Sequence, residues 1–264
     1  MTTPAAEDAT LDEIRREIDA IDDGIVDLMA RRIAASEKVK ARKSTAGSLA
    51  MSPIRPAREA LILRRLVNRG SGTVPPELLV RLWRVILSSS TLAQAPVTIH
   101  VSRKLASSMA TRLLLRDHFG PMPVEDYRDE VQALLQVNMS PGDLCVVEPE
   151  SPWADGFAEG QAGEARVIAS LPVLKGEKIP AYLILGHAQS QAMGDDETII
   201  VSDGRLPRDF IPSPLWQVKS GKRFISCLPG FLSEHEGPLV GLMRSNATLG
   251  LKVAGRYPSP IEVR

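Results

Sequence analysis

Apolar residues recur at alternating steps of three and four positions along the first part of the chain. This spacing is typical of one long helix that packs an apolar stripe against other helices. Thr10, with Glu13 three residues later, favours a capping box at the start, and Gly47 is the first strong stop. We therefore expect a helix over residues 11–45, with a stripe made of Leu11, Ile14, Ile18, Ile21, Ile25, Leu28 and Met29.

Two shorter helices are expected before residue 95. The first should begin near Pro53, with proline at its first helical position, and end within 68–72. The second should follow the Pro-Pro pair at 75–76 and run to about 95. A helix of roughly 35 residues is about 50 Å long, too long to bury its stripe against two short helices of its own chain. The pattern therefore predicts a homodimer.

The pattern changes after Ala95-Pro96 from purely helical to mixed. We expect helices over 102–120 and 130–138, and short apolar runs separated by Gly- and Pro-bearing turns predict strands. The fold class is therefore α+β, with an all-α three-helix domain over 1–95 that forms an intertwined dimer and an α/β domain over 96–264. The expected strands are 97–102, 143–149, 165–174, 181–186, 197–203, 223–229 and 249–255.

Charge and composition exclude several classes of protein. The chain has 32 Lys and Arg against 32 Asp and Glu, so there is no electrostatic case for nucleic acid or membrane as the main partner. Cys145 and Cys227 have no C-x-x-C spacing, which argues against a disulfide framework or a zinc site. The short acidic N-terminus lacks the pattern of a signal peptide, and no run approaches 18 apolar residues. We expect a cytoplasmic protein.

Three stretches of the first domain carry a family resemblance. LDEIRREIDAIDDGIVDLMARRIAASEKVKARK, then IRPARE, then RLWRVILSSSTLAQ follow one another in the order and spacing of the all-helical chorismate mutases, over essentially all of residues 8–95. The resemblance implies an enzyme that isomerises chorismate to prephenate, on the route to phenylalanine and tyrosine, without cofactor or metal. It implies a homodimer in which Arg15 is donated across the interface, and site residues Arg15, Arg32, Lys43, Arg58, Glu59, Ser90 and Gln94.

Helix geometry agrees with that set. Arg32 and Lys43 are eleven residues apart, so they project from one helical face about 16 Å apart, and their long side chains can converge on one small molecule. Arg15 precedes Arg32 by 17 residues, or about 25 Å along the axis. It can reach the same ligand only from the partner chain.

The rearrangement is pericyclic, with no proton transfer and no nucleophile. It needs the folded conformer of the substrate to be held and the negative charge on the breaking ether oxygen to be stabilised. We assign two arginines to the substrate carboxylates, Arg15 from the partner subunit and Arg32 from the chain itself. Lys43 and Gln94 are assigned to the ether oxygen. Glu59 accepts the ring hydroxyl, while Arg58 and Ser90 complete the polar wall.

Simpler roles stay open for two of these residues, and one position departs from the family. The Ser90 hydroxyl has an equally good local role in a hydrogen bond to the carbonyl of Ile86. Gln94 is equally well interpreted as a polar residue at a frayed helix end. Arg55 stands where relatives commonly have Asp. It either adds a contact to a substrate carboxylate or changes how the ring hydroxyl is held.

The second domain resembles the dehydratase and ACT portions of bifunctional chorismate mutase/prephenate dehydratases. The resemblance rests on VTIHVSRKLASSMATRLLLRDHFG, DLCVVEP and LGLKVAGRYPSP. Pro180-Ala181-Tyr182 stands where that family has Thr-Arg-Phe, and the effector segment Glu-Ser-Arg-Pro is absent. The hydroxyl that dehydration needs is therefore missing. We interpret the domain as a degenerate remnant with a structural or regulatory role.

The remaining polar residues add no further site. The four histidines show no metal-ligand spacing, and Cys145 in an apolar run is most simply a core residue. Three functions stay open: a monofunctional mutase, a bifunctional enzyme with a diverged dehydratase, and a non-catalytic regulator that binds chorismate.

Overall fold

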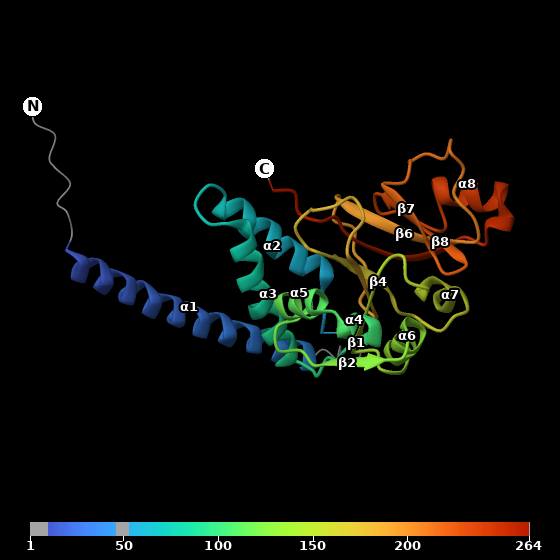
Figure 1. Ribbon diagram of the computed structural model, residues 1–264. Helices are drawn as coiled ribbons and strands as arrows, with labels where there is room; N and C mark the ends of the chain where they lie inside the picture. The colour runs from blue at the N-terminus through green and yellow to red at the C-terminus, as the bar shows by residue number, and fades with distance from the viewer. Residues whose placement is uncertain (1–9, 46–52, 264) are drawn as a thin grey trace, which may run out of the picture. The chain divides into compact units, whose positions relative to one another are not determined.

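The computed structural model describes residues 10–45 and 53–263, and its contacts divide the chain into two compact units, Met1–Ala50 and Met51–Arg264. The described part of the first unit contains one uninterrupted helix, α1 (Leu11–Thr45), as the heptad spacing predicted (Figure 1). The Glu13 carboxylate accepts from the Thr10 backbone N–H at 2.7 Å and from its hydroxyl at 2.8 Å. These bonds lower the pKa of Glu13 and confirm the predicted capping interaction.

The second unit opens with α2 (Pro56–Gly70) and α3 (Pro76–Leu92). The end of α2 and the start of α3 agree with the sequence prediction, but α2 begins at Pro56, so the predicted start near Pro53 was wrong. The physical reason is local: the residue before a proline is disfavoured in the helical region, and Arg55 has φ −130° and ψ 78°. Pro56 takes the first helical position instead.

A mixed nine-stranded sheet forms the centre of the second unit, in the order β2-β1-β3-β5-β4-β9-β6-β8-β7. Its expected members are all found. The strand over 223–229 has the expected bounds, the strands expected over 197–203 and 249–255 are shifted to 196–202 and 252–258, and the other four are shorter than expected. Two further strands, β2 and β7, had not been predicted, and they form the two edges of the sheet. The strands are β1 Ile99–Ser102, β2 Val124–Tyr127, β3 Leu144–Val147, β4 Arg166–Leu171, β5 Tyr182–Gly186, β6 Asp196–Ser202, β7 Trp216–Ser220, β8 Arg223–Pro229 and β9 Lys252–Pro258.

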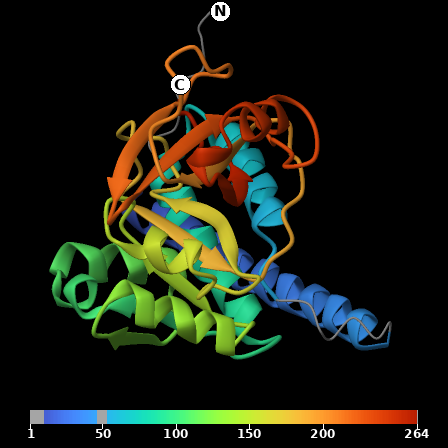
Figure 2. The ribbon, with the colours of Figure 1, turned by 90° about the vertical axis from the view of Figure 1, so that its right-hand side faces the viewer.

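The helices beside the sheet differ from prediction at one break, and the helices Trp153–Ala158 and Pro238–Ser245 had not been predicted. The helix expected over 102–120 is two helices, because Ser108 leaves the helical conformation and its hydroxyl accepts from the Thr111 N–H at 3.3 Å as a cap. In Figure 2 the green helices α4 to α6 lie beside the strands at one side and the red α8 at another. The helices are α4 Arg103–Ser107, α5 Met109–Phe119, α6 Glu130–Met139, α7 Trp153–Ala158 and α8 Pro238–Ser245, followed by a short 3₁₀ turn Ala247–Leu249.

The core lies on both faces of the sheet. Along β3, Cys145 and Val147 join one apolar cluster, while Leu144 and Val146 join the other, as strand alternation requires. Cys145 is a core residue, as predicted, and burial raises the pKa of its thiol well above the ordinary value.

The helices α2 and α3 share a cluster with the C-terminal segment. Leu63 and Val67 of α2 and Leu87 of α3 pack with Ile261, which follows β9. The two helices are therefore held in the same compact unit as the sheet. The domain division at 95/96 stays a prediction. Across residues 10–45 and 53–263, every helix is too short or too polar to cross a bilayer.

Candidate active site

The three cations expected from the first helix all fall within α1. Arg15 is exposed and pairs with Asp12 of its own helix at 3.3 Å. Arg32 is partly buried, and this loss of hydration lowers the pKa of its guanidinium. Lys43 belongs to the last turns of α1, and its side chain lies outside the described residues. Because α1 is continuous, the spacings of about 25 Å and about 16 Å between these positions hold along its axis.

The residues expected from the second helix lie at its start, in different surroundings. Arg55 precedes α2 and is partly buried, whereas Arg58 is exposed. Glu59 points inward and forms a short ion pair with Arg84 of α3, in which the Arg84 Nη1 donates to Oε2. The side chains are only 9% and 16% exposed for Arg84 and Glu59, so solvent screens this pair weakly.

Arg84 also binds the end of a third helix. Its Nε donates to the carbonyl of His118 at 3.1 Å, and the Ser88 hydroxyl donates to the same oxygen at 3.3 Å. His118 lies in the last turn of α5, where carbonyls lack helical partners and the helix dipole favours a cation. Burial, together with the charge of Arg84, lowers the pKa of His118 well below its ordinary value. The imidazole is therefore neutral near pH 7.

A small cavity of about 80 Å³ lies beside this ion pair. Its lining includes Glu59, Arg84, His118 and apolar residues such as Leu63 and Ile168. A cavity of this size holds a few water molecules. Residues 53–263 thus supply an organised carboxylate at Glu59, while the cations expected for the substrate carboxylates, Arg15 and Arg32, belong to α1.

Ser90 and Gln94 both bond to backbone carbonyls of α3. The Ser90 hydroxyl donates to the carbonyl of Ile86 at 2.8 Å, which is the local bond that the sequence left open. The Gln94 amide donates to the carbonyl of Ser90 at 3.0 Å. The two positions are therefore neighbours on one helical face, and their roles toward a substrate stay predictions.

Sequence reasoning missed Arg84, although a signal was present. The buried positions of α3 are Arg84, Leu87, Ser88 and Thr91, which follow helical spacing. A charged residue in line with the buried stripe of a helix has to find a partner inside the protein, because burying an unpaired charge is very unfavourable. That argument predicts a buried carboxylate as the partner of Arg84, and the structure shows that this carboxylate is Glu59.

A comparison with known protein families finds a match in the first part of the chain. Residues 14–95 match the family chorismate mutase type II. This range contains every residue that the sequence assigned to the candidate site, Arg55 included.

The relatives extend the similarity beyond this range. Bifunctional chorismate mutase/prephenate dehydratases of Stutzerimonas stutzeri and Pseudomonas aeruginosa are each 27% identical, over 199 and 203 residues. These alignments cover 69% and 71% of this chain but 54% and 55% of the relatives, so the chain spans about half the length of the curated relatives it matches. The enzyme of the same name from Neisseria gonorrhoeae is 32% identical over 94 residues, 34% of this chain and 25% of the relative.

Two solved structures show distant likeness. A quorum-quenching acylase, GqqA, covers 61% of this chain and 95% of its own with a TM-score of 0.40 and 9% identity. The prephenate dehydratase of Streptococcus mutans covers 62% and 97% with a TM-score of 0.36 and 13% identity.

Proposed function

We propose that this protein is a chorismate mutase, which converts chorismate to prephenate in one pericyclic step without a covalent enzyme intermediate. The observation that carries the proposal is the match of residues 14–95 to chorismate mutase type II, in a chain whose Arg15, Arg32, Lys43, Arg58, Glu59, Ser90 and Gln94 keep the residue types that the reaction needs. The donors hold the dicarboxylate in its folded conformer and stabilise charge on the ether oxygen. Losing one preorganised donor of this kind typically costs about 3 to 4 kcal/mol of transition-state stabilisation.

The active unit in this proposal is a homodimer formed through α1. The heptad residues of this helix are exposed, with Leu11 at 62%, Ile18 at 51% and Ile21 at 55%. Burying one such side chain contributes about 1.5 to 3 kcal/mol. A second copy of the chain is the proposed occupant, because Arg15 lies about 25 Å from Arg32 along one helix and reaches the same substrate only from another subunit.

Glu59 accepts the ring hydroxyl in this proposal, and Arg84 positions it. The ion pair to Arg84 uses Oε2, which leaves the second oxygen as the acceptor for substrate. Arg55 precedes Arg58 and Glu59 by a single helical turn. Its cation therefore favours a contact with a substrate carboxylate over the role of the Asp that relatives commonly have there.

The region from 96 onward is proposed to be structural or regulatory. The similarity to bifunctional relatives continues into it, which keeps a diverged dehydratase as the second candidate. Pro180-Ala181-Tyr182 provides no threonine hydroxyl for that reaction. The proposal also assigns the protein to the cytoplasm, where the buried free thiols of Cys145 and Cys227 stay reduced.

One incubation separates the candidates. Purified full chain is mixed with chorismate, and the loss of chorismate and the appearance of phenylpyruvate are followed together. The proposal predicts loss of chorismate with prephenate as the end product. Phenylpyruvate formation would establish a working dehydratase, and no loss of chorismate would refute a mutase and leave a binding protein.

A further inference from the structure

A cavity of about 1100 Å³ lies at one end of the sheet, within the unit 51–264. Here β4, β8 and β9 end and β5, β6 and β7 begin. The loops after these strand ends and the C-terminal half of α2 form its walls. None of the described residues assigned to the candidate active site lines it. Apolar walls come from Val67, Pro172, Leu215, Trp216 and Ile261.

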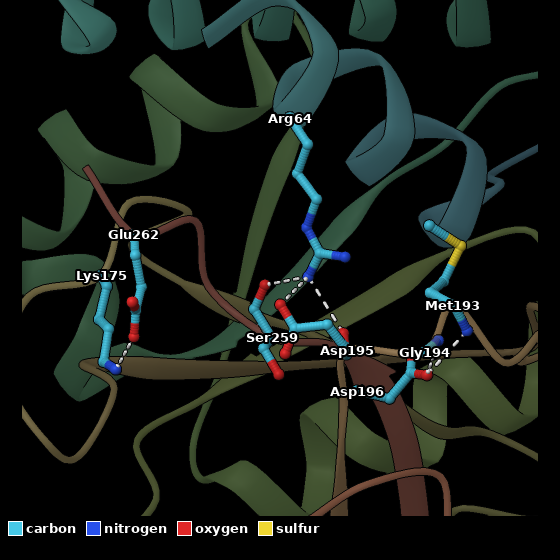
Figure 3. A network of polar contacts seen from close by, with 8 residues as sticks. All are labelled: Arg64, Lys175, Met193, Gly194, Asp195, Asp196, Ser259 and Glu262. Atoms are coloured by element: carbon cyan, nitrogen blue, oxygen red, sulfur yellow. Dashed lines mark hydrogen bonds and ion pairs between the residues drawn. The ribbon is translucent and has the colours of Figure 1, made fainter. Parts of the chain in front are cut away.

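Polar contacts hold the rim of this cavity in place. The Arg64 Nη2 of α2 donates to the carbonyls of Ser259 at 2.8 Å and Asp195 at 3.1 Å, and it pairs with the Asp195 carboxylate at 3.3 Å (Figure 3). Lys175, which also lines the cavity, forms a short ion pair with Glu262. Two of the cations that line the cavity are therefore already paired with carboxylates.

Three other carboxylates at the cavity, the exposed Glu177 together with Asp196 and Glu197, have no cation paired with them among the described residues. Asp196 is only 4% exposed, and its Oδ2 accepts from the N–H groups of Met193 at 2.7 Å and Gly194 at 3.0 Å. Its Oδ1 is buried without a hydrogen-bond partner within the described part of the chain. Figure 3 shows Asp196 turned toward Met193 and Gly194, and Asp195 turned toward Arg64. Asp196 therefore presents a carboxylate without an ion-pair partner at the start of β6.

Glu197 is another carboxylate without an ion-pair partner, and two buried donors fix its position. The Tyr257 hydroxyl donates to Oε2 at 2.7 Å and the Cys227 thiol donates to the same oxygen at 3.2 Å. Burial is the main cause that raises the pKa of both donors well above their ordinary values, so both keep their protons. Within residues 53–263 both of these hydrogen bonds use Oε2, so Oε1 is left as an acceptor on a partly exposed side chain.

Glu197 influences the pKa of a lysine that lines the cavity. The pKa of Lys175 is raised mainly by its hydrogen bond to Glu262, and Glu197 and Asp195 add to this effect. Carboxylates outnumber cations around the cavity, five to three. The five are Glu177, Asp195, Asp196, Glu197 and Glu262, and the three are Arg64, Lys175 and Lys178.

We propose that this cavity binds a small ligand made of a protonated amine on an apolar body. The ammonium donates to Glu197 Oε1, and the apolar body packs against Trp216 and Ile261. An ammonium offers up to three donors. Because the Glu197 acceptor is already oriented, little side-chain conformational entropy is lost on binding. A metal ion fits less well, because the described residues contain no group of three His, Cys, Asp or Glu side chains arranged to hold one.

The test is calorimetric titration of the full chain with three probes that share a phenyl ring and a two-carbon arm. The probes are 2-phenylethylamine, the neutral 2-phenylethanol and the anionic 3-phenylpropanoate. The proposal predicts that the amine binds at least about tenfold more tightly than the alcohol, and that the acid binds more weakly than both.

Two isosteric variants locate the ammonium. Glu197→Gln should weaken binding of the amine at least about tenfold and leave binding of the alcohol unchanged, which also shows that the variant is folded. Glu177→Gln changes an exposed carboxylate of the same cavity and should alter affinity for the amine by less than about twofold. The proposal is overturned if the amine does not bind at millimolar concentration, if the acid binds as tightly, or if Glu197→Gln binds the amine as well as the wild type.

Discussion

The buried pair between Glu59 and Arg84 makes a quantitative prediction about stability. Arg84→Met removes the cation but keeps much of the side-chain volume, and it leaves Glu59 unpaired and the His118 carbonyl without its Arg84 donor. Removing one partner of a buried ion pair typically costs about 3 to 5 kcal/mol. In a unit of this size each kcal/mol lowers the melting temperature by about 2 to 4 °C. We therefore expect a loss of about 10 °C.

A double-mutant cycle separates the pair from its surroundings. Glu59→Gln, Arg84→Met and the double variant are unfolded in urea, and tryptophan fluorescence is followed, since Trp83 lies next to Arg84 in α3. Once the cation is gone, Glu59→Gln removes a buried charge, so the double variant should be at least about 1 kcal/mol more stable than the sum of the single losses implies. Arg81→Met, which breaks an exposed pair with Asp117, is the control and should cost less than about 1 kcal/mol. Additive losses, or a loss from Arg84→Met no larger than from the control, would refute the reasoning.

Two further predictions concern pH. Gln94→Glu should shift the pH–rate profile of chorismate turnover toward acid, because an amide donates at any pH whereas a carboxyl donates only when protonated; an unchanged profile would remove Gln94 from the ether-oxygen role. His118 has a folded pKa below that of the unfolded chain, so the unfolded state binds the additional proton and stability should fall as pH drops below about 6.5, by up to about 1.4 kcal/mol per pH unit. Urea unfolding at pH 7 and pH 5 should show a smaller loss in His118→Gln than in the wild type, and an equal loss would exclude His118 as a source.

The long helix was predictable because its signal is long. Seven apolar positions at heptad spacing indicate the type of α1, while the cap at Thr10 and Glu13 and the stop at Gly47 gave its bounds. The start of α2 was not predictable from the sequence, because either Pro53 or Pro56 can occupy the first helical position. Only the conformation of Arg55 decides between them.

The edge strands were missed for a different reason. Val124–Tyr127 (β2) is almost entirely exposed, so it has no alternation of apolar and polar residues, and its pairing with β1 supplies the structure. Trp216–Ser220 (β7) alternates, but only two apolar residues carry the pattern. The alternation of apolar and polar residues reflects the burial of one face of a strand. This signal is weak wherever a strand is short or largely exposed.

The candidate site shows the same limit. Residue types and helical spacing suggested which side chains of α1 share a face, because those relations are fixed within one element. The partner of Glu59 lies 25 residues away on another helix, and its identity depends on how α2, α3 and α5 pack. The bond from Ser90 to the carbonyl of Ile86 is local, and it was one of the alternatives that the sequence left open.

The most direct test of the central claim is subunit mixing. The claim is that each catalytic site combines Arg32 of one subunit with Arg15 of the other. Arg15→Ala and Arg32→Ala are purified separately, unfolded and refolded together in equal amounts, and chorismate turnover is measured before and after mixing. Arg31→Ala, which changes an exposed arginine next to Arg32, is the control and should stay active.

Each variant alone should be nearly inactive. In the mixture, half of the dimers are heterodimers, and each has one site with both arginines intact and one with neither. The account therefore predicts that mixing restores activity to about a quarter of the wild-type value. A mixture that stays at the average of the two separate variants, or an Arg15→Ala variant that is fully active alone, would contradict the shared site.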